Sequence, residues 1–375
     1  MQSQPVSKKN ARLGVATVLL AGGKGTRLHD LTAAESKPAV HFAGRNRIAD
    51  FVMANIVRSG LDRLVVATQF APATLHNHLP SRWGGHFKPG TMILSDGRGS
   101  YHGTADAVRR NWSRIEGWEA DQVLVLAADH VYDMDYAPLI AAHRASGAAV
   151  TVAVDVVPVT AASGFGVMQT DPGGRILAFQ EKPSQPPGIP GDPDNALVSM
   201  GVYVFEAAWL RDALFGQDLA VLDFGNEVIP AAVAQGLAMA YRLPAGPAGH
   251  AYWRDVGTLE VLRLSHLDFI GQHPPARLPR MSTLSEWYLG RGSVAMPGAL
   301  VPASARLTRC IVAPGTRVTA GLVAGEDPDE DDRWFRRDKE TVLITQSMLD
   351  RREAVRVPFS LHATPRAALQ SRDVA

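Results

Sequence analysis

The stretch VATVLLAGGKGTRL, residues 15–28, joins an apolar run to a glycine-rich loop. The run from Val15 to Ala21 is short, rich in Val and Leu, and bounded by Gly22 and Gly23, which predicts a strand buried on both faces. Basic residues precede the run and give it a faint likeness to a secretion signal. It is too short for that reading and ends directly in glycines. We therefore interpret it as the first strand of an α/β domain.

Similar apolar runs recur along the chain and alternate with amphipathic stretches, as they do in βαβ units. The sequence therefore predicts an α/β fold with a mixed sheet, in which ligands sit at the carboxyl ends of strands. The further strands that we expect are Leu64 to Ala67, Gln122 to Ala127, Val150 to Val157, Ile176 to Glu181 and Leu197 to Phe205, and the clearest helices are Ile48 to Ser59, capped by Gly60, and Leu259 to Asp268.

The carboxy-terminal part of the chain has a different pattern. Apolar residues recur every six positions at Val294, Leu300, Val312 and Val318, with Arg306 out of phase beside Leu307, which is a weak signal for a hexapeptide β-helix. Ordinary short strands joined by turns remain the alternative. Because such a short repeat cannot bury enough surface alone, we expect it to pack on the first domain or on another subunit. The expected divisions are a disordered segment 1–12, a domain 13–270, a proline-rich linker 271–292, the β-helix 293–358 and a tail 359–375.

The composition excludes several classes of partner. The 38 Lys and Arg residues nearly balance the 37 Asp and Glu residues of this 375-residue chain, so no strong field favours nucleic acid or a membrane surface. No apolar segment is long enough to span a bilayer. The single cysteine, Cys310, excludes an internal disulfide and favours a cytoplasmic location. A small-molecule partner fits these properties best.

The glycine loop indicates phosphate binding, because backbone amides without side chains can approach an anion closely. It is not a Walker loop, since Val18 replaces the first glycine, and it is not a dinucleotide fingerprint, since Leu28 replaces the third. A glycine turn without a ligand is the alternative. Three nearby cations, Lys24, Arg27 and Lys37, favour a polyphosphate instead.

Two carboxylates are candidate metal ligands. Asp129 follows the strand Gln122 to Ala127, and Asp255 lies in YWRDVGT before a predicted helix. Each alone is more often a turn or cap residue, but two carboxylates that meet near phosphates would hold Mg²⁺. Lys182, at the end of another predicted strand, would present a cation to a sugar phosphate, with a solvated pair with Glu181 as the alternative.

Ten stretches of the chain carry a resemblance to a known family. They are LLAGGKGTRLHDLT, KPAVHFAGRNRIADF, SYHGTADAV, LAADHVYDMDY, SGFGVM, FQEKPSQPPGIPGDP, SMGVYVF, YWRDVGTLE, LVAGEDPDEDDRWFRR and VLITQSMLD. Taken together, they resemble bacterial ADP-glucose pyrophosphorylase, also called glucose-1-phosphate adenylyltransferase. The resemblance covers nearly the whole chain and keeps the order and spacing of the motifs.

This resemblance implies a nucleotidyltransferase domain over residues 13–270, a left-handed β-helix and a homo-oligomer, usually a tetramer. It implies synthesis of ADP-glucose and pyrophosphate from ATP and glucose 1-phosphate, with Mg²⁺, for glycogen synthesis. The catalytic residues that it implies are Arg27, Asp129, Lys182 and Asp255, with Asp129 and Asp255 as the metal ligands. The nucleotide would bind at Gly22, Gly23, Gly25, Thr26, Lys37 and Gln69, and glucose 1-phosphate at Tyr101, Gly166, Glu181, Lys182 and Ser199.

The substrates explain why no nucleophilic triad is expected. The sugar phosphate oxygen is already an anion near neutral pH, so it attacks the α-phosphorus without a strong general base. The site must instead provide in-line placement and neutralise charge as pyrophosphate departs. Mg²⁺, Arg27 and Lys182 are suitable groups for this work.

The chain departs from the family pattern at three places. Ala128 replaces a glycine before the metal aspartate, and its methyl either crowds the nucleotide or only shifts the loop. Ala33 to Ser36 lacks the usual basic residues and includes Glu35, and most of the β-helix is missing. We therefore expect weak allosteric activation and a smaller or rearranged oligomer. The alternatives are a pyrophosphorylase for another nucleoside triphosphate and sugar 1-phosphate, or an inactive regulatory subunit.

Overall fold

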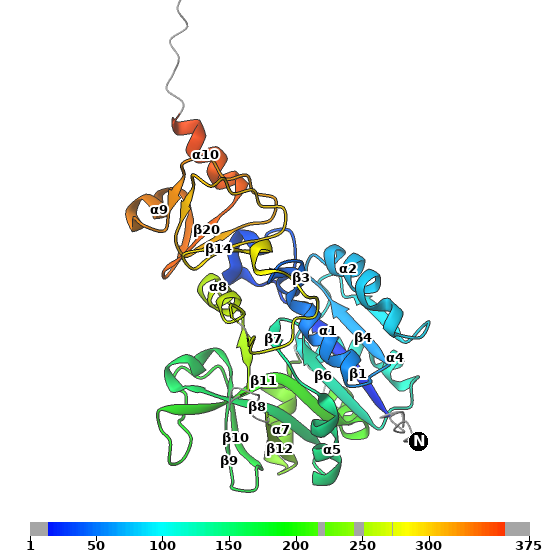
Figure 1. The fold of residues 1–375 in the computed structure, drawn as a ribbon. Coiled ribbons are helices and arrows are strands. Elements are labelled where there is room, and N and C mark those ends of the chain that lie inside the picture. The colour runs from blue at the N-terminus through cyan, green and yellow to red at the C-terminus, as the bar shows by residue number, and fades with distance from the viewer. Residues whose placement is uncertain (1–13, 217–221, 244–250, 272, 357–375) are drawn as a thin grey trace, which may run out of the picture.

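The computed structural model describes residues 14–216, 222–243, 251–271 and 273–356. They form a large α/β unit and a smaller carboxy-terminal unit (Figure 1). The expected disorder of residues 1–12 and the expected tail 359–375 lie outside the described residues. No helix in the described ranges is both long and apolar enough to cross a membrane.

A nine-stranded mixed sheet forms the centre of the large unit, in the order β10-β9-β11-β6-β1-β4-β5, with β8 paired to β11 and β12 paired to β8. Its strands are β1 (Val15–Ala21), β4 (Leu64–Thr68), β5 (Met92–Asp96), β6 (Gln122–Ala127), β8 (Val150–Pro158), β9 (Gly166–Thr170), β10 (Ile176–Glu181), β11 (Asn195–Glu206) and β12 (Ala238–Arg242). Strands β6, β1, β4 and β5 are parallel, so their carboxyl ends meet at one edge. The α/β fold class predicted from the sequence is therefore confirmed.

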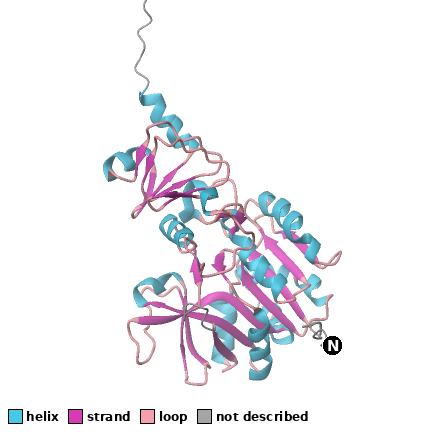
Figure 2. Cartoon of the chain, viewed as in Figure 1, coloured by secondary structure: helices cyan, strands magenta, loops and turns pink. Residues whose placement is uncertain are grey.

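Helices cover both faces of this sheet (Figure 2). Side chains of β1 alternate between the two apolar layers, with Leu19 in one and Val18 in the other. The first layer is closed by α1 (Ile48–Arg58), α2 (Ala73–Trp83) and α5 (Tyr136–Ser146). The second is closed by α3 (Thr104–Arg110), α4 (Trp112–Glu116), α6 (Ala207–Phe215) and α7 (Ile229–Ala234). This double cover explains why β1 reads as a continuous apolar run.

Short elements connect these layers. They are η1 (Thr26–Thr32), η2 (Lys37–Ala39), η3 (Gly84–His86), η4 (Val159–Gly164) and η5 (Phe224–Val228), together with the strand pairs β2 (His41–Phe42) with β3 (Asn46–Arg47) and β7 (His130–Tyr132) with β13 (Trp253–Asp255). Helix α8 (Leu259–Leu267) then leads towards the carboxy-terminal unit.

The carboxy-terminal unit is a short stack of parallel strands with an antiparallel strand at each edge of its larger sheet. Its larger sheet has the order β14-β15-β17-β20-β19, and β16 pairs with β18 in parallel. The elements are η6 (Leu284–Glu286), β14 (Tyr288–Gly290), β15 (Ser293–Ala295), β16 (Arg306–Leu307), β17 (Cys310–Val312), β18 (Val323–Ala324), α9 (Pro328–Trp334), β19 (Arg336–Asp338), β20 (Thr341–Ile344) and α10 (Gln346–Arg356). Val294, Val312 and Val318 of the six-residue repeat are buried, and so is Leu307 beside the out-of-phase Arg306. Leu300 departs from this pattern, because its side chain is 58% exposed.

The two units share one apolar core. Leu259 and Leu262 of α8 pack in the same cluster as Phe42 of the large unit and Ile311 and Leu343 of the carboxy-terminal unit. Arg263 of α8 is also buried and donates a hydrogen bond to the Thr341 hydroxyl at 2.7 Å. The expectation that the short β-helix packs on the first domain therefore agrees with the structure.

Candidate functional site

The loop after β1 folds against Lys37. Gly25 has φ of +68°, a left-handed conformation, and a Cβ there would lie 2.6 Å from the Cβ of Lys37. The Thr32 hydroxyl donates to the carbonyl of Gly25 at 2.8 Å, and the Lys37 amide donates to Gly23 at 3.4 Å. Glycine is therefore needed at position 25 both for the turn and for the close approach to Lys37.

Asp129 and Asp255 meet although they are far apart in the sequence. Asp129 lies between β6 and β7, while β13 pairs with β7 so that Asp255 is opposite His130. One oxygen from each carboxylate and one ring nitrogen of His130 all lie within 4.8 Å of one another. The two carboxylates therefore meet in the structure, which sequence separation alone could not show.

The ammonium of Lys37 lies between these two carboxylates. Its Nζ is 2.5 Å from Oδ1 of Asp255 and 3.0 Å from Oδ2 of Asp129. The Nε2 of His130 is farther away, at 3.6 Å from Asp129 and 3.8 Å from Asp255. Only 6% of the Lys37 side chain is exposed, against 30% of the Asp129 side chain.

The charges of this cluster support one another. Burial alone would lower the pKa of Lys37, but Asp129 and Asp255 outweigh it and raise that pKa above its ordinary value. Burial alone would raise the pKa of Asp129, whereas Lys37 and, to a smaller extent, His130 hold it well below its usual range. Asp129 is therefore ionised and available to a cation near neutral pH.

Arg27 borders the same cluster. A Cβ on Gly257 would lie 2.8 Å from Nη2 of Arg27 and 3.2 Å from Oδ2 of Asp255, so both side chains surround that glycine. Thr26 begins the short helix η1, which carries Arg27. The glycine loop thus brings a second cation to the metal-ligand candidates.

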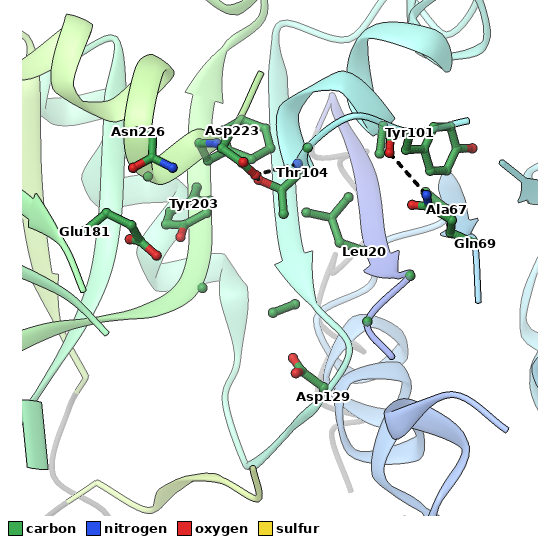
Figure 3. Close-up of a pocket in the computed structure, with 18 of the residues that line it drawn as sticks. Leu20, Ala67, Gln69, Tyr101, Thr104, Asp129, Glu181, Tyr203, Asp223 and Asn226 are labelled. Atoms are coloured by element: carbon green, nitrogen blue, oxygen red, sulfur yellow. Dashed lines mark hydrogen bonds between the residues drawn. The ribbon is translucent and has the colours of Figure 1, made fainter. Parts of the chain in front are cut away.

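A cavity of about 450 Å³ opens beside this cluster. Its wall includes seven residues predicted from the sequence: Gly22, Gly23, Gln69, Tyr101, Asp129, Glu181 and Lys182. Figure 3 shows Asp129 and Gln69 near the end of β1, with Glu181 on the opposite side. The Gln69 amide donates to the backbone carbonyl of Tyr101 at 3.1 Å.

Lys182 has an unusual backbone conformation. Its φ is +47°, in the left-handed region that non-glycine residues seldom adopt, and its amide donates to Phe165 at 3.0 Å. Its ammonium lies 2.8 Å from Oε1 of Glu181, and 65% of the side chain is exposed. The strained turn therefore places a largely exposed cation, paired with Glu181, at the wall of the cavity.

Three predicted sugar-site residues have less direct positions. The Tyr101 hydroxyl is bonded to Ser95 and Asn111, and its ring is turned away from the middle of the cavity (Figure 3). Gly166 is not part of the cavity wall, and a Cβ there would come 2.4 Å from the ring of Phe179 and 3.0 Å from Oε2 of Glu181. The Ser199 hydroxyl donates to the Tyr203 hydroxyl at 3.2 Å, and Tyr203, not Ser199, lines the wall.

Ala128 does not face the cavity. Its side chain is fully buried in the apolar layer beneath the sheet, and its amide donates to Leu20 at 3.0 Å. The cavity wall includes its neighbours Ala127 and Asp129. The methyl group of Ala128 therefore does not line this cavity.

One wall of the cavity was missed from the sequence. Asp223, Phe224, Gly225 and Asn226 line it together with Thr104 and Tyr203. The sequence DFGN at the start of η5 is the signal that could have revealed this wall. Its glycine lets the backbone come close to Glu181, since a Cβ on Gly225 would lie 2.4 Å from Oε2 of that residue.

Comparisons with known proteins found two matching family models and several similar relatives. The family described as "Nucleotidyl transferase" matches residues 16–269, and that described as "GlmU-like, C-terminal hexapeptide" matches residues 280–345. Glucose-1-phosphate adenylyltransferase of Granulibacter bethesdensis is 38% identical over 89% of this chain and 96% of its own length. The protein of that name from Cereibacter sphaeroides is 36% identical over 94% of the chain and 99% of its length. Glucose-1-phosphate adenylyltransferase 2 of Alkalilimnicola ehrlichii is 37% identical over 93% of the chain and 98% of its length.

Proposed function

The chain belongs to the glucose-1-phosphate adenylyltransferases, and from this premise we infer that it joins ATP and glucose 1-phosphate into ADP-glucose and pyrophosphate for glycogen synthesis. The observation that carries the site assignment is the convergence of Lys37, Asp129 and Asp255 beside one cavity. Such a set of charges suits a polyphosphate and its cation.

The two ends of the cavity suit different substrates. Gly22, Gly23 and Gln69 lie at the carboxyl ends of parallel strands, where backbone amides are open to phosphates, so we place ATP there. Glu181 and Lys182 lie on the opposite side, where an acceptor for sugar hydroxyls and a cation for a phosphate are adjacent. We place glucose 1-phosphate at that side, near Tyr203 and Asp223.

The donor set also fits a hard divalent cation. Nucleotidyl transferases generally use a divalent metal, and we propose Mg²⁺, which prefers carboxylate oxygens and substrate phosphates. Asp129 and Asp255 would hold it, and His130 is a poorer ligand for such an ion. When bound, the ion would neutralise charge on the reacting phosphates.

The reaction needs placement more than proton transfer. A phosphate oxygen of glucose 1-phosphate attacks the α-phosphorus of ATP, and the bond from that phosphorus to the oxygen bridging to the β-phosphorus breaks, so that pyrophosphate leaves with the electron pair. Lys182 would orient the attacking phosphate, while Arg27 would stabilise the departing charge. No described residue has to act as a strong general base in this scheme.

A direct assay tests this proposal. Purified protein is mixed with ATP, glucose 1-phosphate and Mg²⁺, and pyrophosphate release is measured against parallel reactions with UTP, GTP and CTP. We expect release with ATP to be fastest. A preference for another nucleoside triphosphate would assign a different product, and no release with any of them would identify the chain as an inactive subunit.

We also propose a homo-oligomer and a cytoplasmic location. Leu300 and Val323 of the carboxy-terminal unit are exposed apolar residues that a second subunit would cover, and sedimentation would test this. The cysteine content, with Cys310 buried and unpaired, favours a reducing compartment.

We also expect weak activation by sugar phosphates. Glu35 forms an ion pair with Arg47 at 3.1 Å, and this pair neutralises the guanidinium charge that an anionic activator would need.

A further inference from the structure

The ammonium of Lys37 lies between the two carboxylates that are proposed to hold the metal ion. Its ammonium hydrogen-bonds to Oδ1 of Asp255 and lies 3.0 Å from Oδ2 of Asp129, so it bridges the two carboxylates as a cation would. Its backbone is fixed in η2 and its Cβ packs against the glycine loop. This arrangement is therefore built into the local fold.

A divalent ion held between the two carboxylates would compete with this ammonium. Lys37 already engages one oxygen of each carboxylate, Oδ1 of Asp255 and Oδ2 of Asp129. Carboxylate oxygens approach Mg²⁺ to about 2.0–2.1 Å, so an ion bound to this pair would lie close to the ammonium, and the two positive charges would repel each other in a partly buried site. Binding of the ion therefore favours movement of the ammonium away from the pair.

We propose that Lys37 is a resident counter-cation that divalent metal displaces from the Asp129–Asp255 pair, and that its freed ammonium then turns to the phosphates of the nucleotide. The inference rests on the function proposed above and adds a positioning role for Lys37. Pro38, the next residue, lines the cavity, so the flexible stem of Lys37 is close enough for this movement. Metal and nucleotide would then bind cooperatively, because phosphates give the displaced ammonium a new partner.

Metal binding without nucleotide tests the exchange. Mn²⁺ serves as the probe, and the free ion is measured by electron paramagnetic resonance during titration of the wild type and of Lys37→Met. The variant leaves two facing carboxylates without a counter-cation, so its dissociation constant for Mn²⁺ should be at least about tenfold lower. An equal or weaker affinity in the folded variant would overturn the exchange.

Lys24→Met is the matched control. It removes the same charge and makes the same side-chain change near the cavity, but the Lys24 ammonium lies over the ring of Phe70, 5.3 Å from its centroid. Its Mn²⁺ affinity should stay within about twofold of wild type. A tightening as large as that of Lys37→Met would show that general charge loss, and not the bridge, controls binding, and would also overturn the proposal.

Two further measurements guard against misinterpretation. If Lys37→Met fails to fold, the wild-type protein with ¹³C-labelled lysine is titrated with Mg²⁺ without nucleotide. The Cε resonance of Lys37 should then shift, and a resonance that does not shift would overturn the exchange.

Asp129→Asn tests the metal site itself. If that variant binds Mn²⁺ as well as wild type, the metal assignment of the proposed function fails; if it loses binding while Lys37→Met does not tighten, only the exchange fails.

Discussion

Asp223 and Thr104 are joined by two hydrogen bonds to a single oxygen, Oδ1 of Asp223, which accepts from the Thr104 amide at 2.7 Å and from its hydroxyl at 2.8 Å. The pair joins the start of α3 to the segment before η5, so it connects two walls of the cavity (Figure 3).

We expect Asp223→Ala to raise the KM for glucose 1-phosphate about thirtyfold, because two hydrogen bonds that hold the wall are lost and each contributes about 1 kcal/mol. Asp223→Asn keeps an acceptor oxygen and should change KM by no more than about threefold. Initial-rate kinetics with both substrates measures this. Equal effects of the two variants would contradict the positional role.

Lys182→Ala should raise the half-saturating concentration of glucose 1-phosphate by about tenfold to a hundredfold. A charge-assisted contact to the phosphate is worth about 1.5–3 kcal/mol, and the Lys182 side chain, which is largely exposed beside its partner Glu181, is placed to make it. The exposed Lys88 provides a control, since Lys88→Ala should leave the value unchanged. A wild-type value for Lys182→Ala would remove this residue from the sugar site.

Asp129→Asn should abolish measurable turnover while the protein remains folded. The substitution preserves side-chain size but removes the negative charge that a metal ligand needs. Pyrophosphate release and a thermal melting curve are measured on the same preparation. Turnover at the wild-type level would show that Asp129 does not hold the catalytic cation.

His266 should make the protein less stable in mild acid. Burial lowers its pKa from an ordinary 6.5 to about 4, although a hydrogen bond to the Leu262 carbonyl opposes this shift. Between these values the unfolded chain binds more protons than the folded one, so stability falls as pH decreases from 6.5 towards 4, by on the order of 1 kcal/mol per pH unit.

Denaturant unfolding from about pH 7 to pH 5 checks this dependence. The variant His266→Gln should show a slope smaller by about 1 kcal/mol per pH unit, whatever its absolute stability. His273 is exposed, and His273→Gln should keep the wild-type slope. An unchanged slope in His266→Gln would mean that this ring is protonated in the folded protein as readily as in the unfolded one.

The fold could be predicted from the sequence where burial dominates. Strands such as Val15–Ala21 and Gln122–Ala127 are covered on both faces, and their apolar runs end where the strands end. The repeat in the carboxy-terminal unit predicted buried positions well, but periodicity could not show that Leu300 faces solvent. Whether a repeat position of a short β-helix is buried depends on which residues pack against it. The six-residue spacing does not contain that information.

The site could be predicted only in part. The glycine loop and its cations have a local signature, whereas the meeting of Asp129 with Asp255 depends on the pairing of β7 with β13. Asp223 was missed because its role depends on Thr104, which is distant in the sequence. The ring of Tyr101 turns away because Ser95 and Asn111 bind its hydroxyl. Contacts of this kind arise from tertiary structure alone.

Helix α8 has a mechanical consequence. Asp255 ends β13, a few residues before Leu259 begins the helix, and the far side of the helix is anchored to the carboxy-terminal unit by shared apolar packing and by Arg263. The helix therefore joins a metal-ligand candidate directly to the carboxy-terminal unit, so the position of Asp255 depends on how that unit is seated.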